Sequence, residues 1–342
     1  MIKKGLGKVI ILVNTGTPDS YEIGDVRRYL SQFLNDKNVV DLPWLLRKLL
    51  VNLIIIPFRA PKSAALYRKL WTEKGSPLKI NMDNLVKKVQ ESVGEKFIVI
   101  GAFRYGNPSL LKTLWDLKAD PPGSITLLPL YPQYASSTSG TVIELAASEL
   151  KHLEKSTEIR IIDQFYSHPA YIDAITDHLR SFDLSDYDYV LFSYHGLPLR
   201  QINRIHPRRN AAVCDCTKRM PAEGRFCYKA ACYETSRILA SRLRLEDDKW
   251  GTSFQSRLTR NWTGPFTDEM LKKLAATGKK RVLVTAPSFV ADCLETIIEI
   301  NEEYRKLFLN SGGTVFTYAG CLNDNTKWAE AVLKIADQNH KY

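Results

Sequence analysis

The amino-acid sequence predicts an α/β protein with two similar doubly wound, Rossmann-like domains built on parallel sheets. Short apolar segments rich in β-branched residues alternate with longer helical segments. The apolar segments are nearly continuous rather than alternating, which is typical of strands covered by helices on both faces. A chain of 342 residues is also too long for one comfortable hydrophobic core.

Each apolar segment is expected to form one strand, and each longer segment one helix. The expected strands are Lys8–Asn14, Phe97–Ala102, Ile125–Leu130, Ile159–Ile162, Tyr189–Ser193, Arg281–Ala286 and Thr314–Tyr318. The expected helices are Gly24–Leu34, Asp83–Val93, Ser109–Leu117, Ser139–His152, Pro169–Ser181, Ala230–Arg244, Asp268–Ala276, Asp292–Leu309 and Lys327–Ala336. No low-complexity linker divides the chain, so we expect domains at 1–165 and 166–342, with the last helix able to pack back on the N-terminal domain.

The charge balance narrows the classes of partner. The 48 Lys and Arg residues outnumber the 37 Asp and Glu residues, giving a net charge of +11. This excess fits a protein that binds nucleic acid, an anionic membrane surface or an acidic substrate. With 44% hydrophobic and 25% charged residues, the composition excludes a disordered chain and a membrane bundle.

The ends and the apolar runs favour a cytoplasmic protein. The run Val9–Val13 is too short for the core of a signal peptide. The run Leu49–Phe58 contains an Asn and a Pro, and its ten residues are too few to span a bilayer as a helix. Stable disulfides are rare in the cytoplasm, so clustered cysteines there point to a metal before a disulfide.

Familiar nucleotide motifs are missing from the sequence. There is no G-x-x-x-x-G-K, and no G-x-G-x-x-G follows a predicted strand. H-E-x-x-H is also absent. Ligands of open α/β sheets bind beyond the carboxyl ends of the strands, so residues directly after each strand are the first candidates for a site.

His195 is such a candidate. It follows the predicted strand Tyr189–Ser193 and precedes Gly196 and Pro198. An imidazole at this place can act as a general base or a metal ligand near neutral pH. The alternative is a hydrogen-bonded structural histidine at the end of a strand.

Three carboxylates follow another predicted strand. Glu295, Glu299 and Glu303 are spaced by four residues, so they share one face of a helix. No Lys or Arg occurs between Arg281 and Arg305, although a solvated helix face usually mixes both signs. The row can conduct a divalent cation by carboxylate ligation. The alternative is a solvated helix surface.

Four cysteines lie within 19 residues. They are Cys214, Cys216, Cys227 and Cys232, in a segment of about 206–232 with many basic residues. Four thiolates can hold zinc or an iron–sulfur cluster, and the spacing does not separate the two. Independent free thiols are the remaining interpretation.

The segment 44–71 combines apolar residues with six Lys or Arg residues. A basic, apolar segment can lie on an anionic membrane surface or accept an apolar ligand. A buried helix with a solvated basic edge would have the same composition.

Together, these motifs resemble the ferrochelatases, which insert Fe2+ into a porphyrin at the end of haem synthesis. The resemblance is collinear over nearly the whole chain and rests on eight motifs. They are Asn14-Thr-Gly-Thr-Pro18, Lys74-Gly-Ser-Pro77, Phe103-Arg-Tyr-Gly-Asn-Pro108, Leu130-Tyr-Pro-Gln-Tyr134, Ser193-Tyr-His-Gly-Leu-Pro198, Phe254-Gln-Ser256, Trp262-Thr-Gly-Pro265 and Phe289-Val-Ala-Asp-Cys-Leu-Glu295. Any one would be weak, but eight in the same order are specific.

The resemblance implies a chelatase-type fold with a porphyrin cleft between the domains and an apolar pocket lip at 44–71. It implies that His195 and Glu295 handle pyrrole protons and metal, and that Glu299 and Glu303 continue the path of the substrate iron. It further implies a set of porphyrin-binding residues: Thr15, Ser76, Arg104, Tyr105, Trp262 and Phe289. The expected activity is that of a lyase that inserts Fe2+ into protoporphyrin IX and forms protohaem.

The cysteine segment resembles that of bacterial ferrochelatases whose four ligands to a [2Fe–2S] cluster are all internal. The resemblance therefore implies a [2Fe–2S] cluster on Cys214, Cys216, Cys227 and Cys232. Cys293 stands where many members have a histidine, which puts in doubt a direct metal-ligand role for that position. The expected partners are protoporphyrin IX, ferrous iron, haem and a peripheral contact with the inner-membrane surface, with no nucleotide and no nucleic acid.

Two rival functions remain at this stage. A chelatase of the same fold could use coproporphyrin III or insert cobalt. A nucleic-acid-binding protein with a four-cysteine metal knuckle would also explain the net charge, but the basic residues show no recognition-helix pattern.

Overall fold

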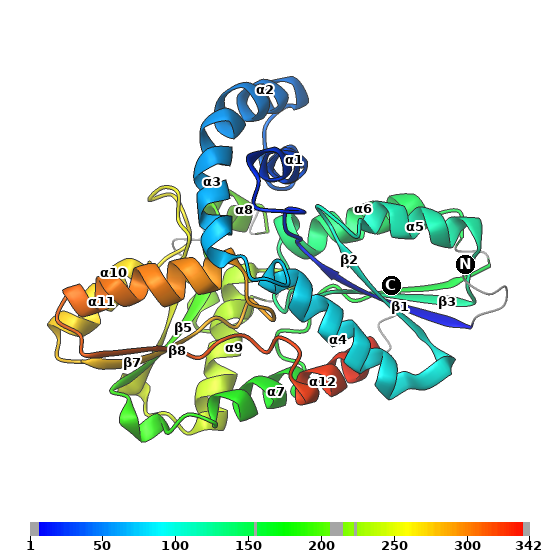
Figure 1. Ribbon diagram of the computed structural model, residues 1–342. Helices are drawn as coiled ribbons and strands as arrows, with labels where there is room; N and C mark the ends of the chain where they lie inside the picture. Colours follow the sequence, from blue (N-terminus) through cyan, green and yellow to red (C-terminus); the bar gives the residue numbers. More distant parts are fainter. Residues whose placement is uncertain (1–6, 154–155, 206–214, 222–223, 338–342) are drawn as a thin grey trace. The chain divides into compact units, whose positions relative to one another are not determined.

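The computed structural model describes residues 7–153, 156–205, 215–221 and 224–337 (Figure 1). The chain forms two compact units, one of residues 1–131, 136–164 and 324–342 and one of residues 132–135 and 165–323. Each unit holds a four-stranded sheet in which every neighbouring pair is parallel. The predicted class of two parallel-sheet α/β domains is confirmed. The C-terminal helix belongs to the first unit.

The first unit has the strand order β2-β1-β3-β4. Its strands are β1 (Lys8–Asn14), β2 (Ile98–Phe103), β3 (Ser124–Pro129) and β4 (Glu158–Ile161). Its helices are α1 (Ile23–Leu34), α2 (Trp44–Leu49), α3 (Ile56–Leu70), α4 (Pro77–Val93), α5 (Leu110–Ala119), α6 (Thr141–Leu150) and α12 (Thr326–Ala336). Helices α4 and α12 pack together, as do α5 and α6.

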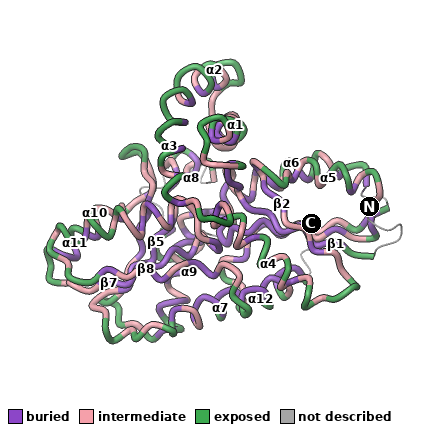
Figure 2. Tube along the Cα trace, in the orientation of Figure 1, coloured by how far each residue is buried: buried purple, intermediate pink, exposed green. Residues whose placement is uncertain are grey.

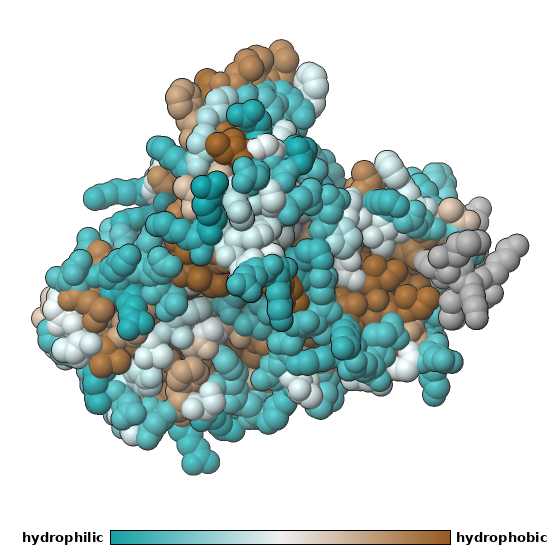
Figure 3. All heavy atoms as spheres, in the orientation of Figure 1, coloured by the Kyte–Doolittle hydropathy of each residue, from teal (hydrophilic) through white to brown (hydrophobic). Residues whose placement is uncertain are grey.

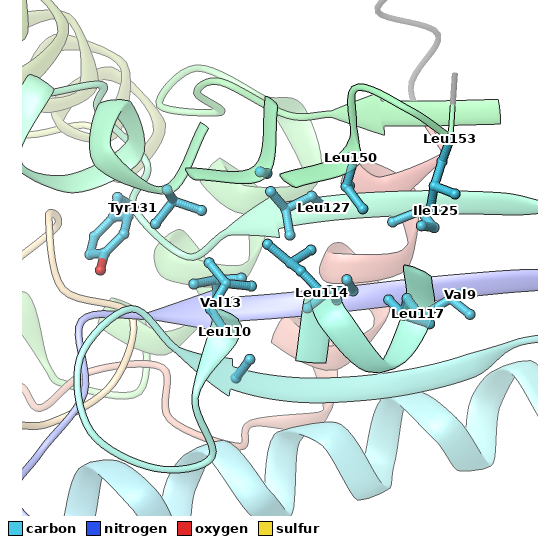
Figure 4. Packing of buried hydrophobic residues seen from close by; sticks show 14 residues of the cluster. Val9, Val13, Leu110, Leu114, Leu117, Ile125, Leu127, Tyr131, Leu150 and Leu153 are labelled. Atoms are coloured by element: carbon cyan, nitrogen blue, oxygen red, sulfur yellow. The ribbon is translucent and has the colours of Figure 1, made fainter. Parts of the chain in front are cut away.

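The core of this unit explains why its central strands are apolar throughout. Val9, Ile11 and Val13 of β1 are 1%, 0% and 0% exposed and pack with β3 against α5 and α6 (Figure 4). Ile10 and Leu12, whose side chains point to the other face of the strand, are also buried. Both faces of β1 are therefore removed from water.

A segment for which no helix was predicted forms a long helical arm. Helices α2 and α3 join through a π-helical segment, Leu50–Ile55, into one run from Trp44 to Leu70. The run passes Pro57 and Pro61, although a proline lacks the N–H that an α-helix uses. A π-helical turn directly before Pro57 fits this place, because π turns accommodate local breaks in α-helical hydrogen bonding.

The arm leaves most of its apolar residues in contact with water. Seven of the twelve exposed large apolar side chains among the described residues lie on it: Trp44, Leu45, Leu46, Leu49, Leu53, Ile54 and Phe58. Figure 2 shows α2 mostly exposed, and Figure 3 shows apolar side chains gathered over it. The helix is longer than the ten-residue run Leu49–Phe58 considered in the sequence: its 27 residues, Trp44–Leu70, are long and apolar enough to cross a membrane by length and composition alone. The core helices of soluble proteins pass the same test.

The second unit has the strand order β6-β5-β7-β8. Its strands are β5 (Tyr189–His195), β6 (Trp250–Gln255), β7 (Arg281–Thr285) and β8 (Val315–Tyr318). Its helices are α7 (Pro169–Leu179), α8 (Leu199–Asn203), α9 (Tyr228–Leu243), α10 (Thr267–Ala276) and α11 (Arg305–Asn310), and a π-helical segment, Glu295–Tyr304, precedes α11. Buried residues of α10, α11 and the π-helical segment pack against β5, β7 and β8.

The strand β6 is absent from the predicted set. Its sequence, WGTSFQ, has no apolar run, yet Thr252, Ser253 and Gln255 are buried. Two of them find side-chain partners inside the unit: the Ser253 hydroxyl lies 2.9 Å from the Thr267 hydroxyl, and Gln255 Oε1 accepts from Ser193 at 2.8 Å. A strand stabilised by side-chain hydrogen bonds does not show in a hydrophobicity pattern.

Candidate active site

His195 is the last residue of β5 and lies beside Gln255, the last residue of β6. The backbone N–H of Gly196 donates to the carbonyl of Gln255 at 2.8 Å. A Cβ at Gly196 would lie 2.8 Å from that same oxygen, so the close approach requires glycine. The chain thus places a half-buried imidazole at the carboxyl edge of the sheet, where ligands of such folds bind.

The contacts of His195 fix its tautomer. Its Nδ1 lies 2.6 Å from the carbonyl oxygen of Gly196. A carbonyl oxygen only accepts, so Nδ1 must carry the hydrogen. In the neutral ring, Nε2 then carries the lone pair and is the atom that can take a proton or bind a metal.

Two aromatic side chains flank the imidazole. The ring centres of Trp262 and Phe289 lie 6.4 Å and 6.2 Å from that of His195. Both residues are half-buried and were predicted to bind the porphyrin. The structure brings these two predicted residues to the predicted catalytic histidine.

The carboxylate row lies on the π-helical segment Glu295–Tyr304. Glu299 accepts from the backbone N–H of Ser256 at 2.8 Å, the Ser256 hydroxyl at 2.5 Å and the Tyr304 hydroxyl at 2.7 Å. Ser256 has φ 61°, a left-handed conformation that is uncommon outside glycine. This strained backbone directs both of its donors to one carboxylate.

Burial is the largest influence on the acidity of Glu299, and it raises the pKa of that carboxyl. The hydroxyls of Ser256 and Tyr304 and the charge of His195 lower the pKa, while the charge of Glu295 raises it. Glu299 therefore interacts electrostatically with both predicted catalytic residues. Glu303, one step further along the row, is exposed.

Glu295 lies at the start of the π-helical segment and is half-buried. Its carbonyl oxygen is 3.5 Å from Nε2 of Gln255, next to His195 in the sheet. Burial and the charge of Glu295 raise the pKa of the neighbouring Cys293 thiol well above its usual range. Cys293 is thus a neutral thiol beside the carboxylate.

The other predicted porphyrin-binding residues belong to the first unit. The backbone N–H groups of Arg104 and Tyr105 donate at 2.9 Å to the carbonyls of Asn14 and Thr15. The next residue after Thr15 is Gly16, which has φ 111°. A Cβ at Gly16 would lie 1.7 Å from the Tyr105 carbonyl oxygen. Thr15 also has its hydroxyl 2.8 Å from that of Tyr131.

Asp36 is a residue that sequence reasoning missed. Its Oδ2 receives hydrogen bonds from Arg104 Nη2 at 2.7 Å, from the Tyr105 hydroxyl at 2.9 Å and from the Thr141 hydroxyl at 2.5 Å. The sequence around Asp36 does not predict this role, because the residues that donate to Asp36 are distant in the chain. Ser256 and Tyr304 were also missed, although Ser256 stands in a recognised motif.

Two surface hollows accompany the predicted residues of the first unit. One of about 410 Å³ lies beside the buried Ser76, whose hydroxyl accepts from Thr17 at 2.9 Å. Its walls come from three of the recognised motifs, together with Asp19, Trp71 and Lys79. The other hollow, of about 490 Å³, is lined by Arg104 and Asp36 with Arg28, Ser31, Gln32, Asn35 and Lys48.

Three of the four clustered cysteines fall within the described residues, and Cys214 lies outside them. The Sγ atoms of Cys216 and Cys227 are 3.5 Å apart, and both residues are fully buried. Cys232 is also fully buried, and burial raises the pKa of its thiol well above the usual range. In the part of the chain that the structure describes, no three His, Cys, Asp or Glu side chains form a group that could hold a metal ion.

Known proteins resemble the chain over nearly its whole length. A family model described as Ferrochelatase matches residues 7–340. A protein named ferrochelatase from Legionella pneumophila (strain Paris) is 41% identical over 335 residues, covering 96% of this chain and 98% of that protein. Another from Pseudomonas putida (strain W619) is 40% identical over 336 residues, with the same coverage.

Solved structures are similar in fold. The sirohydrochlorin chelatase SirB from Bacillus subtilis subspecies spizizenii, in complex with cobalt, superposes with a TM-score of 0.53 at 10% identity and covers 97% of each chain. SirB from Bacillus subtilis with Fe3+ gives 0.51 at 12% identity, covering 97% of this chain and 96% of that one. At these identities the likeness concerns the fold alone.

Proposed function

This chain belongs to the ferrochelatase family, and we propose that it inserts Fe2+ into protoporphyrin IX to form protohaem, the last step of haem b synthesis. One structural observation carries the proposal beyond family membership. The lone pair on Nε2 of His195 lies on an imidazole flanked by Trp262 and Phe289 and electrostatically coupled to Glu299. A base, aromatic surfaces and carboxylates are the groups that metal insertion into an apolar macrocycle needs.

Metal insertion requires the loss of two pyrrole N–H protons, so a base must lie near the ring nitrogens. In this proposal His195 and Glu295 are the catalytic residues and share the handling of protons and metal. His195 accepts at Nε2, because Nδ1 donates to the carbonyl of Gly196. The substrate iron accepts imidazole nitrogen and carboxylate oxygen ligands, which both residues supply.

The carboxylate row provides the route for iron in this proposal. Glu303 is exposed and receives the hydrated ion, while Glu299 and Glu295 are half-buried positions one and two helical turns earlier on the π-helical segment. Glu299 is held by three hydrogen bonds, so its carboxylate is preorganised rather than free to turn to solvent. Because its pKa is raised, it can also carry a proton in exchange for a cation.

We assign porphyrin binding to Thr15, Ser76 and Arg104, and to the aromatic rings of Tyr105, Trp262 and Phe289. Aromatic faces bury an apolar macrocycle, and the hydroxyls and the guanidinium offer hydrogen bonds to its carboxylates. Asp36 holds Arg104 and Tyr105 in place, so we assign it a positioning role.

We propose that the cysteine segment holds a [2Fe–2S] cluster, and the two cysteines that meet in the structure support this assignment. Cys216 and Cys227 face each other at 3.5 Å, in the range expected of two thiolates on one iron. Cys214 and Cys232 complete the proposed ligand set of four thiolates. Cys232 would release its proton on binding, since its buried thiol is neutral. When bound, the cluster supplies metal–thiolate bonds that crosslink this segment, because insertion itself needs no electron transfer.

We further propose that the protein is cytoplasmic and touches the inner-membrane surface through its helical arm. The arm exposes Trp44, Leu53 and Phe58 by 66%, 67% and 73%. Lys48, Arg59 and Lys62 on the same arm match the charge of an anionic membrane. Protoporphyrin and haem partition into such a surface, so contact there would aid their exchange.

Metal-insertion assays test the main proposal. Purified protein should convert Fe2+ and protoporphyrin IX into protohaem, with coproporphyrin III and Co2+ compared under the same conditions. Strong preference for coproporphyrin III would contradict the substrate, and failure to insert any divalent metal would contradict the activity. For the cluster, anaerobically purified protein should be red-brown with stoichiometric iron and sulfide. Colourless protein with one zinc per chain would refute it.

A further inference from the structure

The side chain of Tyr228 links the cysteine segment to His195. Tyr228 is the first residue of α9 and directly follows Cys227, which is the N-cap of that helix. Its hydroxyl donates to the carbonyl oxygen of His195 at 2.8 Å. Tyr228 is only 5% exposed, so this hydrogen bond is shielded from water.

On the side of the cysteines, Tyr228 is connected closely to the Cys216–Cys227 pair. Sγ of Cys227 accepts from the backbone N–H of Ala230 and lies 3.5 Å from Sγ of Cys216. A change at this pair therefore acts on the first turn of α9, where Tyr228 lies. Cys232, one helical turn later on α9, is also fully buried.

On the side of the imidazole, the backbone of His195 is held on both of its polar groups. Its carbonyl accepts from Tyr228, and its N–H donates to the Ser288 hydroxyl at 3.3 Å. Because Nδ1 bonds to the carbonyl of the adjacent Gly196, the direction of Nε2 follows this stretch of backbone. A shift of Tyr228 would thus turn the atom that works on the substrate.

We propose that Tyr228 is a positioning residue through which the state of the Cys216–Cys227 pair sets the orientation of the His195 imidazole. The inference rests on the proposed function, and it gives the cysteine segment a role in metal insertion without an electron-transfer step. A displacement of about 1 Å in a reacting group can cost about a hundredfold in rate, so a small change at the cysteines is sufficient.

Tyr194 supplies a matched control. It is also a fully buried tyrosine that contacts α9, with its hydroxyl 2.9 Å from that of Ser236. Among the described residues, the hydroxyl of Tyr194 makes no hydrogen bond to the polar groups of His195. If tyrosine hydroxyls matter here only for packing β5 against α9, then Tyr194→Phe and Tyr228→Phe should have similar effects.

The experiment compares Tyr228→Phe, Tyr194→Phe, Cys216→Ser and the double variant Tyr228→Phe/Cys216→Ser, all in the full chain purified anaerobically. Two quantities are measured: kcat and KM for metal insertion, and the chemical shift of the His195 ring at one fixed pH. The His195→Ala spectrum assigns that resonance among the six histidines. The chemical shift reports on the imidazole independently of activity.

Tyr228→Phe should lower kcat about tenfold with an unchanged porphyrin KM and should move the His195 resonance. Tyr194→Phe should do neither. Cys216→Ser should act in the same direction as Tyr228→Phe and should add little in the double variant, because both interrupt one connection. Equal effects of the two tyrosine variants, or a full Cys216→Ser effect in the double variant, would overturn the inference.

Two further controls keep the outcomes distinct. Inactive wild-type protein would overturn the proposed function, whereas an active wild type with an unmoved His195 resonance in Cys216→Ser overturns only this inference. Should Tyr228→Phe not fold, Ser288→Ala replaces it as the variant that interrupts the same network. An additive Cys216→Ser effect in that background would again reject the connection.

Discussion

Ser256 holds the carboxylate of Glu299 with both of its donors, the backbone N–H at 2.8 Å and the hydroxyl at 2.5 Å. These bonds stabilise the charged form of Glu299, and yet burial outweighs them and raises its pKa. The structure therefore holds the Glu299 carboxyl group in one position, although burial there makes its ionisation less favourable. Groups arranged in this way are typical of functional sites rather than of surfaces built for stability.

This balance predicts how stability depends on pH. A carboxyl with a raised pKa binds more protons in the folded state than in the unfolded state. Stability should therefore fall as pH rises from the ordinary Glu value through the raised one. Glu299→Gln should flatten this decline, while Glu303→Gln, an exposed change of the same kind, should leave it intact. Thermal unfolding of the wild type and both variants is measured from about pH 4, near the ordinary Glu pKa, to about pH 8. A parallel decline in Glu299→Gln would contradict the assignment.

The catalytic assignment predicts a loss of activity without a loss of fold. His195→Ala and Glu295→Gln should each lower kcat for iron insertion by about 10² to 10⁴, the usual contribution of a positioned acid or base. Circular dichroism and the unfolding midpoint should remain close to those of the wild type. His152→Ala and Glu302→Gln are the controls. Near-wild-type turnover in either catalytic variant would remove that residue from the mechanism.

Alanine substitutions at Gly16 and Gly94, two glycines of positive φ, should differ strongly in how far they destabilise the protein. An alanine Cβ at Gly16 would lie 1.7 Å from the Tyr105 carbonyl oxygen, a backbone atom that cannot turn aside. Gly16→Ala should destabilise the protein by about 4 kcal/mol or more, the size reserved for severe packing conflicts. Gly94 has φ 60° and nothing within 4 Å of a Cβ, so Gly94→Ala should cost only about 1 kcal/mol. Denaturant midpoints of the two variants give the comparison.

The helical arm predicts a measurable affinity for anionic lipid. Leu53→Glu/Phe58→Glu should abolish co-sedimentation with phosphatidylglycerol vesicles, because burying these side chains contributes about 1.5–3 kcal/mol each and the new charges repel the surface. Leu309→Glu, an exposed leucine on α11, should not affect binding. Equal binding by the wild type and the arm variant would exclude the arm as the contact.

The sequence predicted the elements whose stability comes from apolar burial. The strand β1 was predicted to the residue, because Val9 to Val13 are all removed from water. The edge strand β6 was missed because hydroxyl and amide bonds of Ser253 and Gln255 stabilise it. The arm was missed although it is apolar, since only the ten-residue run Leu49–Phe58, with its Asn and Pro, was considered, whereas the helix passes Pro57 and continues to Leu70.

The candidate site shows the same division. His195 and the carboxylate row follow strands in the sequence, so their positions could be predicted from topology. Ser256 and Asp36 could not, because they act through hydrogen bonds to residues distant in the sequence, and Tyr304 could not, because it lies outside every recognised motif. The π-helical winding of Glu295–Tyr304 also left no periodic signature distinct from an α-helix in so short a segment.

The membership of α12 in the first unit has a consequence for synthesis on the ribosome. Trp328, Ala329, Val332 and Ile335 of α12 are buried in that unit, and α12 packs against α4. The core of the first unit therefore cannot be completed until α12 has been translated, after the whole second unit. Until then, the apolar surface of α4 that α12 covers remains open to chaperones, and the second unit can complete its core first.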